Sequence, residues 1–208
     1  MPITRKSCRR YLTPDEIQIL LLALQGRDRL IVRLFLLCAL RPGELFALRW
    51  RSIEPGRLRI EEAVYRGHIG SPKTEGSRAY VALPKSIQME LDFWQHQCGD
   101  PDQDEFVFQS QKKTPLDSHN YLRRFLAPLA KENGIEGLTF QCLRRTFATQ
   151  FQRHGTVKDA QAQLRHSDAG TTMNIYTQEI PSSVRAAVEA LDQKLCGFLN
   201  TIEHGMKM

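Results

Sequence analysis

The chain has few cysteines, and they are not arranged for metal binding or redox chemistry. Its five cysteines are odd in number, far apart, and include no Cys-x-x-Cys pair, which disfavours a zinc ribbon and a thioredoxin-type motif. They are Cys8, Cys38, Cys98, Cys142 and Cys196. An odd, scattered set is typical of a reduced intracellular protein, and we expect a cytoplasmic location.

Long apolar runs are missing as well. The two longest, Ile17–Leu24 and Leu30–Leu40, are too short to cross a bilayer, and Arg33 interrupts the second. The basic, polar N-terminus has no apolar stretch of the kind found in signal peptides. We therefore expect no membrane association. The chain also lacks a His-Glu-x-x-His motif and clustered carboxylates, so we expect no metal and no other cofactor.

What is present describes a folded chain with a moderate basic excess. Hydrophobic residues make up 41% and charged residues 25% of 208 residues, which excludes a disordered tail. The 29 basic and 23 acidic residues give a net charge of +6, which permits nucleic-acid binding without establishing it. We expect one folded domain over residues 11–197, preceded by a basic arm or linker remnant at 1–10 and followed by a flexible tail at 198–208.

The periodicity predicts a mostly α (α+β) fold with a small antiparallel sheet of three strands. Thr13 and Glu16 form a capping box around Pro14 and start the first helix, which ends near Gly26. Further helices are predicted over 28–40, 44–48, from Pro84 through Trp94, and at about 118–133, 139–153, 156–165, 171–176 and 182–197. Strands are predicted within residues 57–83, where Leu58–Glu61 and Tyr80–Leu83 alternate, and over Phe106–Phe108.

Two basic residues in the first half of the chain stand out. Arg41 follows the most apolar predicted helix and precedes a Pro-started helix, so its guanidinium lies beside free backbone N–H groups that suit a phosphate. The alternative is an ion pair with Glu44 that only fixes the turn. Lys73 lies in a polar Ser-Pro-Lys-Thr-Glu-Gly stretch between strands, where a lysine is usually a solvated edge charge.

Two further segments carry polar residues beside an apolar helix stripe. Gln141 and Arg144 are three residues apart and lie off the face formed by the apolar residues of that helix. Two successive arginines there also fit one solvated and one paired side chain. His166 ends one short predicted helix and Tyr176 ends the next. Separately, a histidine at such a position commonly caps the helix, and a tyrosine commonly packs in the core.

Taken in order, these residues resemble the catalytic domain of the tyrosine recombinase (phage integrase) family over about residues 11–197. That family orders its site as Arg, Lys, His-x-x-Arg, His or Trp, then Tyr. Arg41, within a segment similar to the family's Leu-Arg-x-x-Glu-Leu, matches the first arginine, and Lys73 matches the lysine. Arg144 matches the second arginine, His166 the third position, and Tyr176, which ends Thr-Thr-Met-Asn-Ile-Tyr, the nucleophile.

The resemblance implies a multi-helical integrase-like catalytic domain that acts on double-stranded DNA. Tyr176 would attack a phosphodiester to give a 3′-phosphotyrosyl link and a free 5′-hydroxyl, and rejoining would need neither ATP nor metal. Arg41, Arg144 and His166 would stabilise the charged transition state. Lys73 would be the general acid for the leaving 5′-oxygen.

Two residues depart from the family pattern. Gln141 stands where the family usually has His; it can donate a hydrogen bond to a phosphate oxygen but cannot exchange a proton near neutral pH. Arg165 stands where Gly commonly precedes the histidine, and we expect helical backbone angles there, which accept Arg. The family's separate N-terminal DNA-clamping domain is not in these residues, which fits either an excised domain or a minimal relative.

These departures keep two other functions open. The first is a catalytically weakened DNA-binding relative, with Gln141 as a sign of decay. The second is a DNA-relaxing enzyme like the type IB topoisomerases, which use a similar site. The C-terminal segment over 182–195 also has two interpretations: its apolar residues at helical spacing form either a helix folded on its own core or, as the resemblance implies, one that docks into a neighbouring protomer of a tetramer on DNA.

Overall fold

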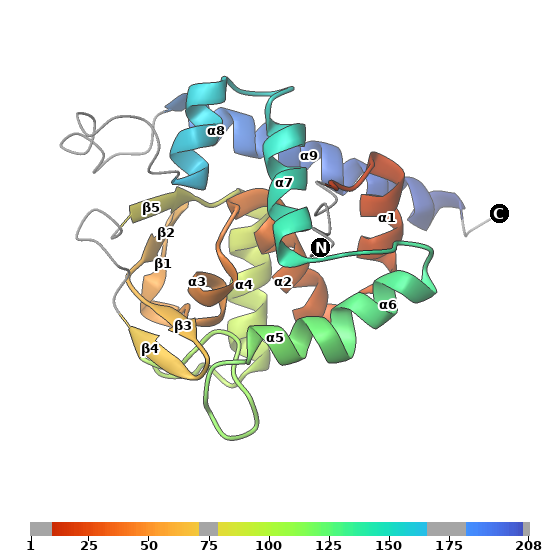
Figure 1. The fold of residues 1–208 in the computed structure, drawn as a ribbon. Coiled ribbons are helices and arrows are strands. Elements are labelled where there is room, and N and C mark those ends of the chain that lie inside the picture. The colour runs from red at the N-terminus through yellow and green to blue at the C-terminus, as the bar shows by residue number, and fades with distance from the viewer. Residues whose placement is uncertain (1–9, 71–78, 166–181, 206–208) are drawn as a thin grey trace, which may run out of the picture.

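Helix α2 (Gly26–Cys38) lies at the centre of the computed structural model (Figure 1). The structure describes residues 10–70, 79–165 and 182–205. Every α2 side chain from Leu30 to Cys38 is buried, as expected for the most apolar of the predicted helices. A helix apolar nearly all round has to be covered on every side. The helices that pack against it are α1 (Pro14–Ala23), α3 (Pro42–Phe46), α4 (Lys85–Gln97), α7 (Phe140–Phe151) and α9 (Ser182–Gly205).

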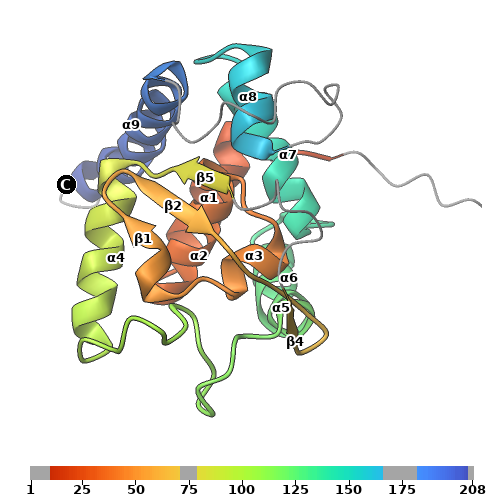
Figure 2. The ribbon, with the colours of Figure 1, turned by 90° about the vertical axis from the view of Figure 1, so that its left-hand side faces the viewer.

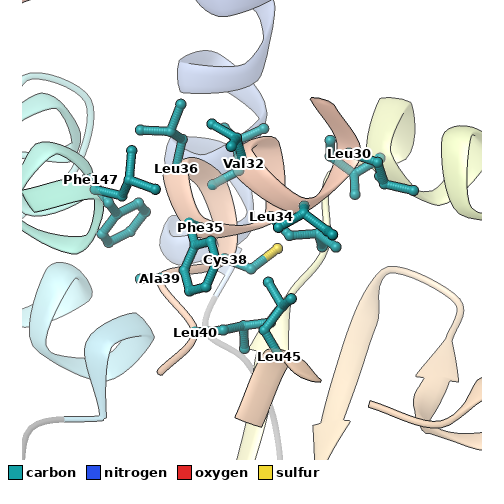
Figure 3. Packing of buried hydrophobic residues seen from close by; sticks show 14 of the residues in the cluster. Leu30, Val32, Leu34, Phe35, Leu36, Cys38, Ala39, Leu40, Leu45 and Phe147 are labelled. Atoms are coloured by element: carbon teal, nitrogen blue, oxygen red, sulfur yellow. The ribbon is translucent and has the colours of Figure 1, made fainter. Parts of the chain in front are cut away.

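The core combines the apolar face of α7 with that of α2. Leu143, Phe147 and Phe151 share one face of α7, as their spacing predicts, and all three are fully buried. Figure 3 shows α2 side chains such as Phe35 and Leu36 together with Phe147 of α7. This packing fixes α7 along α2, and with it every polar residue on the other faces of α7.

A three-stranded antiparallel sheet, in the order β1-β2-β5, confirms the predicted small sheet (Figures 1 and 2). Its central strand pairs Leu58 with Ile53 on one side and with Val81 on the other. Leu58 and Val81 are fully buried, so the alternation that predicted the strands places their apolar side chains in the core. The strands are β1 (Ile53–Glu54), β2 (Arg57–Ile60) and β5 (Ala79–Ala82).

Two local predictions differ from the structure. The polar stretch before residue 71 forms a second two-stranded sheet, β3 (Ala63–Tyr65) with β4 (His68–Gly70). Its sequence gives no alternation because β4 is exposed along its whole length. Phe106–Phe108 is buried but is not the predicted strand; Phe106 makes only an isolated bridge to Arg49. One partner residue is too few to form a ladder.

Two predicted helices differ in detail. The helix expected over 118–133 consists of α5 (Ser118–Tyr121), a π-helical turn over Leu122–Leu126, and α6 (Ala127–Glu132). Pro128 near the start of α6 has no N–H to continue an α-helical ladder, which accounts for the wider turn before it. Helix α9 continues to Gly205, past the predicted end near Gly197, because a single glycine inside a helix costs only about 1 kcal/mol.

Helix α9 is fastened to the core by a buried arginine. Arg33 of α2, only 3% exposed, donates a hydrogen bond of 2.7 Å to Asp192 of α9 and one of 3.0 Å to Ser86 of α4. It also pairs with Glu90. The apolar face of α9 is buried in the same chain, through Val184, Ala187, Val188, Leu191 and Leu195. Over these residues the helix folds back on its own core.

Candidate active site

Three arginines meet where the ends of α2 and α8 (Val157–Leu164) approach the start of α3 and the side of α7. Arg41 immediately precedes α3, Arg144 lies on α7, and Arg165 immediately follows α8. Ala39 ends α2 in the left-handed backbone conformation, with φ of 50°. Such a residue stops a helix and turns the chain, so Arg41 begins a new element.

Arg41 and Glu44 form the ion pair that their spacing allows. The guanidinium Nη1 donates to Glu44 Oε1 at 2.9 Å, and the Arg41 backbone N–H donates to Oε2 at 2.7 Å. Arg41 also donates from Nη2 to the Arg165 carbonyl oxygen at 3.2 Å. The Arg41 side chain is nevertheless 48% exposed, whereas that of Glu44 is 7% exposed. The guanidinium therefore stands at the solvent side of the cluster.

Arg144 caps the ends of two helices and has no carboxylate partner among the described residues. It donates from Nη1 to the Ala39 carbonyl and from Nη2 to the Leu164 carbonyl, at the C-terminal ends of α2 and α8, where partial negative charge collects. These bonds use two of the five N–H donors of a guanidinium. Burial, together with Arg41 and Arg165, lowers the pKa of Arg144 to about 10. Arg144 therefore keeps its charge at neutral pH.

Arg165 corrects one expectation. Its backbone is not helical but left-handed, with φ of 51° and ψ of 46°, because α8 ends at Leu164 and Arg165 is the capping residue. Glycine adopts this conformation without cost, and other residues do not. The side chain turns inward, 11% exposed, and donates from Nη2 to Glu44 Oε2 at 2.5 Å.

The cluster holds more positive than negative charge. Arg41, Arg144 and Arg165 contribute three guanidinium charges, and Glu44 is the one carboxylate with which the described residues pair them. Burial opposes ionisation of Glu44, but Arg165 and the hydrogen bonds from Arg41 outweigh it and hold the pKa of that carboxyl below its usual 4.5. With Glu44 ionised, the four side chains carry a net charge of +2. A partly buried site of this kind suits an anion.

Gln163 fixes the end of α8 to the sheet. Its side chain, 2% exposed, accepts a hydrogen bond from the Ala82 N–H and donates one to the Ala82 carbonyl, both at 3.1 Å. Ala82 lies in β5, whose other side pairs with β2. The amide of Gln163 thus takes the place of a neighbouring strand at this point. Through this amide, α8 is held against strand β5 of the sheet.

Gly43 brings the hairpin β3–β4 against the start of α3. A Cβ atom built on Gly43 would lie 2.6 Å from the Val64 carbonyl oxygen in β3. No side chain fits at that separation, so the close contact of α3 with β3 depends on glycine. The Arg-Pro-Gly-Glu sequence therefore supplies the arginine, the helix start, the close contact and the carboxylate from successive residues.

Of the predicted site residues, the structure places Arg41 and Arg144 together. Gln141 lies one turn before Arg144 on α7 and is exposed. Lys73, His166 and Tyr176 lie outside the described residues. Arg165 is the member of the cluster that the sequence does not assign to the site. The one indication in the sequence is an arginine in place of the glycine that suits a left-handed helix end.

The described residues hold neither a cluster of metal ligands nor a membrane-spanning helix. No group of three or more His, Cys, Asp or Glu residues within 10–70, 79–165 and 182–205 could hold a metal ion. Nor does any helix in those ranges combine the length and apolar character needed to span a bilayer.

Comparison with known proteins gives this geometry its context. The model of the Phage integrase family matches residues 10–182. The chain belongs to the phage integrase family. It is 28% identical to a tyrosine recombinase XerC-like protein of Caldanaerobacter subterraneus subsp. tengcongensis, over 86% of this chain and 52% of that protein. It is 27% identical to tyrosine recombinase XerD of Halalkalibacterium halodurans, over 89% of this chain and 62% of that protein.

Solved integrase structures share the fold. The Tn1549 transposon integrase, in complex with a circular intermediate DNA, superimposes with a TM-score of 0.68 at 19% identity, over 90% of this chain and 67% of that one. The XerA recombinase superimposes with a TM-score of 0.63 at 23% identity, over 88% and 64%. The chain spans about half the length of the first curated relatives, at 52% and 57%.

Proposed function

We propose that this chain is the catalytic part of a site-specific DNA recombinase that cleaves and rejoins DNA in the cytoplasm through a 3′-phosphotyrosyl intermediate. The observation that carries the proposal is the cation-rich cluster of Arg41, Arg144 and Arg165 around the single carboxylate of Glu44. Family membership and the DNA-bound transposon integrase of the same fold support double-stranded DNA as the substrate.

The cluster suits the transition state of phosphodiester cleavage. As a nucleophile adds to phosphorus, negative charge grows on the non-bridging oxygens, and fixed cations stabilise it without reorganising. Arg41 stands at the solvent side, where a DNA phosphate can approach, and Arg144 stands behind it with a charge that no described carboxylate balances. Each guanidinium offers a planar fork of donors that fits two phosphate oxygens. His166 would add a further donor and Gln141 a neutral one.

The bond changes follow from these roles. The Tyr176 hydroxyl oxygen bonds to phosphorus and loses its proton to water or to His166, while the bond from phosphorus to the 5′-oxygen breaks. Lys73 gives a proton to that 5′-oxygen. In rejoining, the 5′-hydroxyl of another strand attacks phosphorus and gives its proton to Lys73, the bond to Tyr176 breaks, and the tyrosine recovers a proton from water or His166. The phosphotyrosyl link conserves the bond energy, so the cycle needs no ATP.

Covalent trapping tests the proposal directly. The protein is incubated with nicked duplexes tiled from DNA flanking its own gene, so that the cleaved end diffuses away and the intermediate accumulates. A denaturing gel then shows any protein–DNA adduct, and Tyr176→Phe is the control. We expect an adduct that the control variant does not form. An adduct that persists in Tyr176→Phe would assign the nucleophile elsewhere.

Trapping combined with a gel shift and a supercoil-relaxation assay separates the two other candidate functions. The neutral, exposed Gln141 favours a relative that binds DNA without cutting it, which would retain duplexes in a gel shift and give no adduct. A topoisomerase-like enzyme would relax supercoiled DNA without sequence preference, whereas a recombinase forms its adduct only at its own site.

Lys73 has a test of its own as the general acid. Replacing Lys73 with Ala should slow cleavage of an ordinary phosphodiester, because the departing 5′-oxygen then lacks its proton donor. A bridging sulfur leaves without a proton, so a 5′-thio substrate should restore the rate. Equal slowing on both substrates would assign Lys73 to DNA binding instead.

We also propose that copies of the chain assemble on DNA, as a tetramer in the full reaction. The apolar face of α9 up to Leu195 is already buried in this chain, so docking between copies would use the part of α9 beyond it. A truncation after Gly197 keeps the buried face and Asp192 intact. It should leave the melting temperature unchanged and abolish assembly on a two-site duplex. Unchanged assembly would remove α9 from the interface.

A further inference from the structure

We infer that Arg165 is a positioning residue that occupies the Glu44 carboxylate and thereby leaves the positive charges of Arg41 and Arg144 available to a phosphate. The inference rests on the proposed function, because it concerns the same phosphate site. It assigns a task to a residue that matches none of the family's catalytic positions.

The first argument is the way Glu44 is shared. Its Oε1 accepts from the Arg41 guanidinium at 2.9 Å, while its Oε2 accepts from Arg165 Nη2 at 2.5 Å and from the Arg41 backbone N–H at 2.7 Å. Arg165 also accepts Arg41 Nη2 on its carbonyl oxygen at 3.2 Å. Arg165 therefore holds Arg41 through its backbone carbonyl. Its side chain pairs with one of the two oxygens of Glu44, the carboxylate that would otherwise neutralise Arg41 alone.

The second argument is charge. With Arg165 in place, three guanidinium groups share one carboxylate and the cluster carries +2. Without the Arg165 charge, Glu44 would balance Arg41 alone and the cluster would carry +1. An opposite charge within about 4–6 Å changes an ionisation equilibrium by one to three powers of ten, and a bound phosphate responds to the same field.

The third argument is that Arg165 is a costly residue where it stands. Its backbone is left-handed, with φ of 51°, a conformation that glycine occupies freely. Its guanidinium is taken out of water, and Nε is buried without a hydrogen-bond partner among the residues that the structure describes. Strained and incompletely paired residues of this kind are concentrated at functional sites. Stability alone does not account for an arginine here.

The test measures binding of inorganic phosphate by calorimetry, in parallel with the rate of adduct formation on a nicked duplex. Arg165→Met removes the charge and leaves the backbone requirement unchanged, and we expect phosphate binding weaker by about tenfold or more. Arg165→Lys keeps the charge and should stay close to wild type. The decisive variant is Arg165→Met combined with Glu44→Gln, which returns the cluster to +2 and should recover most of the lost affinity.

Arg27→Met is the matched control. It removes the same charge at the far end of α2, about 18 Å from Ala39 at 1.5 Å per residue, beyond the screening length of about 8 Å. It should leave phosphate binding unchanged. If circular dichroism shows that Arg165→Met does not fold, Arg165→Gly is the second neutral variant, because glycine suits the left-handed backbone.

Each outcome decides the inference. Recovery in the double variant supports it, since a purely structural role would leave the double variant as weak as Arg165→Met or weaker. No recovery overturns it, and so does a wild-type chain that binds no phosphate. Phosphate binding that depends on Arg165 in a chain that forms no adduct would sustain the inference and overturn the proposed cleavage.

Discussion

One arginine cluster is centred on α2 and another lies beyond its end, and their net charges have opposite signs. Near the middle of α2, Arg33 is surrounded by the carboxylates of Asp192 and Glu90, so one cation meets two anions. Beyond the end of α2, Arg41, Arg144 and Arg165 share the single carboxylate of Glu44. Both clusters take guanidinium groups out of water, and both connect elements that are distant in sequence.

The difference separates structural from functional burial of charge. The buried cation Arg33 is already neutralised by its two carboxylates and needs no further anion. Its role is to hold α2, α4 and α9 together. Among the described residues, Arg144 is a buried cation without its own carboxylate and is paired with the carbonyls of Ala39 and Leu164; the proposed phosphate would supply its anion. The excess charge, rather than the presence of arginine, marks the site.

The largest expected effect is on stability at the first cluster. Arg33→Ala leaves Asp192, 5% exposed, without its cation and should lower the free energy of unfolding by about 3–5 kcal/mol in urea denaturation. Replacing both partners, with Arg33→Met and Asp192→Leu, removes the unpaired charge and should recover most of that loss. Arg27→Ala on the surface should change stability by less than about 0.5 kcal/mol. Equal losses in the single and double variants would contradict this account.

The next effect is on rate, at the second cluster. Arg144→Lys keeps the charge but loses the fork that reaches two carbonyls and a phosphate together. We expect adduct formation to slow by about 10²–10³-fold, equivalent to about 2.7–4 kcal/mol, with unfolding changed by only about 1–2 kcal/mol. Arg33→Ala, assayed where it is folded, should cut at nearly the wild-type rate. The comparison fails if both variants lose stability and rate in the same proportion.

The sequence predicted the second cluster better than the first. Arg41 and Arg144 follow from an ordered motif and from the apolar stripe of α7, both of which are local patterns. The pairing of Arg33 with Asp192 joins residues that are distant in the chain, and no periodicity encodes it. The sequence predicts a helical backbone for Arg165 because the residues before it are helical. Only the structure shows that α8 ends one residue earlier.

A smaller effect is expected from a buried polar residue that carries no charge. Gln163→Leu removes the amide that pairs with the N–H and carbonyl of Ala82 and should cost about 1–3 kcal/mol of unfolding free energy, because these buried groups lose a partner. Gln161→Leu on the exposed side of α8 is the matched control and should be nearly neutral. If Gln163→Leu is as stable as the control, the sheet does not depend on this amide to hold α8.

The smallest effect is the pH dependence contributed by Glu44. Its pKa in the folded chain lies below the usual 4.5, so the folded state binds this proton less readily than the unfolded state. The resulting stability is fully present above about pH 4.5 and is lost as the pH falls through the folded pKa. The difference in unfolding free energy between wild type and Glu44→Gln should therefore shrink on acidification.

Glu105 provides the matched comparison for Glu44. Hydrogen bonds from Lys113 and Gln109 also lower its pKa, but its side chain is 28% exposed, against 7% for Glu44, and an ion pair open to solvent is screened by salt. Urea denaturation at two salt concentrations should measure how the unfolding free energy of each variant differs from wild type as the pH falls. Added salt should leave this acid-sensitive difference in place for Glu44→Gln and reduce it for Glu105→Gln. Equal salt sensitivity would mean that Glu44 is as open to solvent as Glu105. The carboxylate would then not hold Arg41 and Arg165 in the sheltered arrangement on which the proposed phosphate site depends.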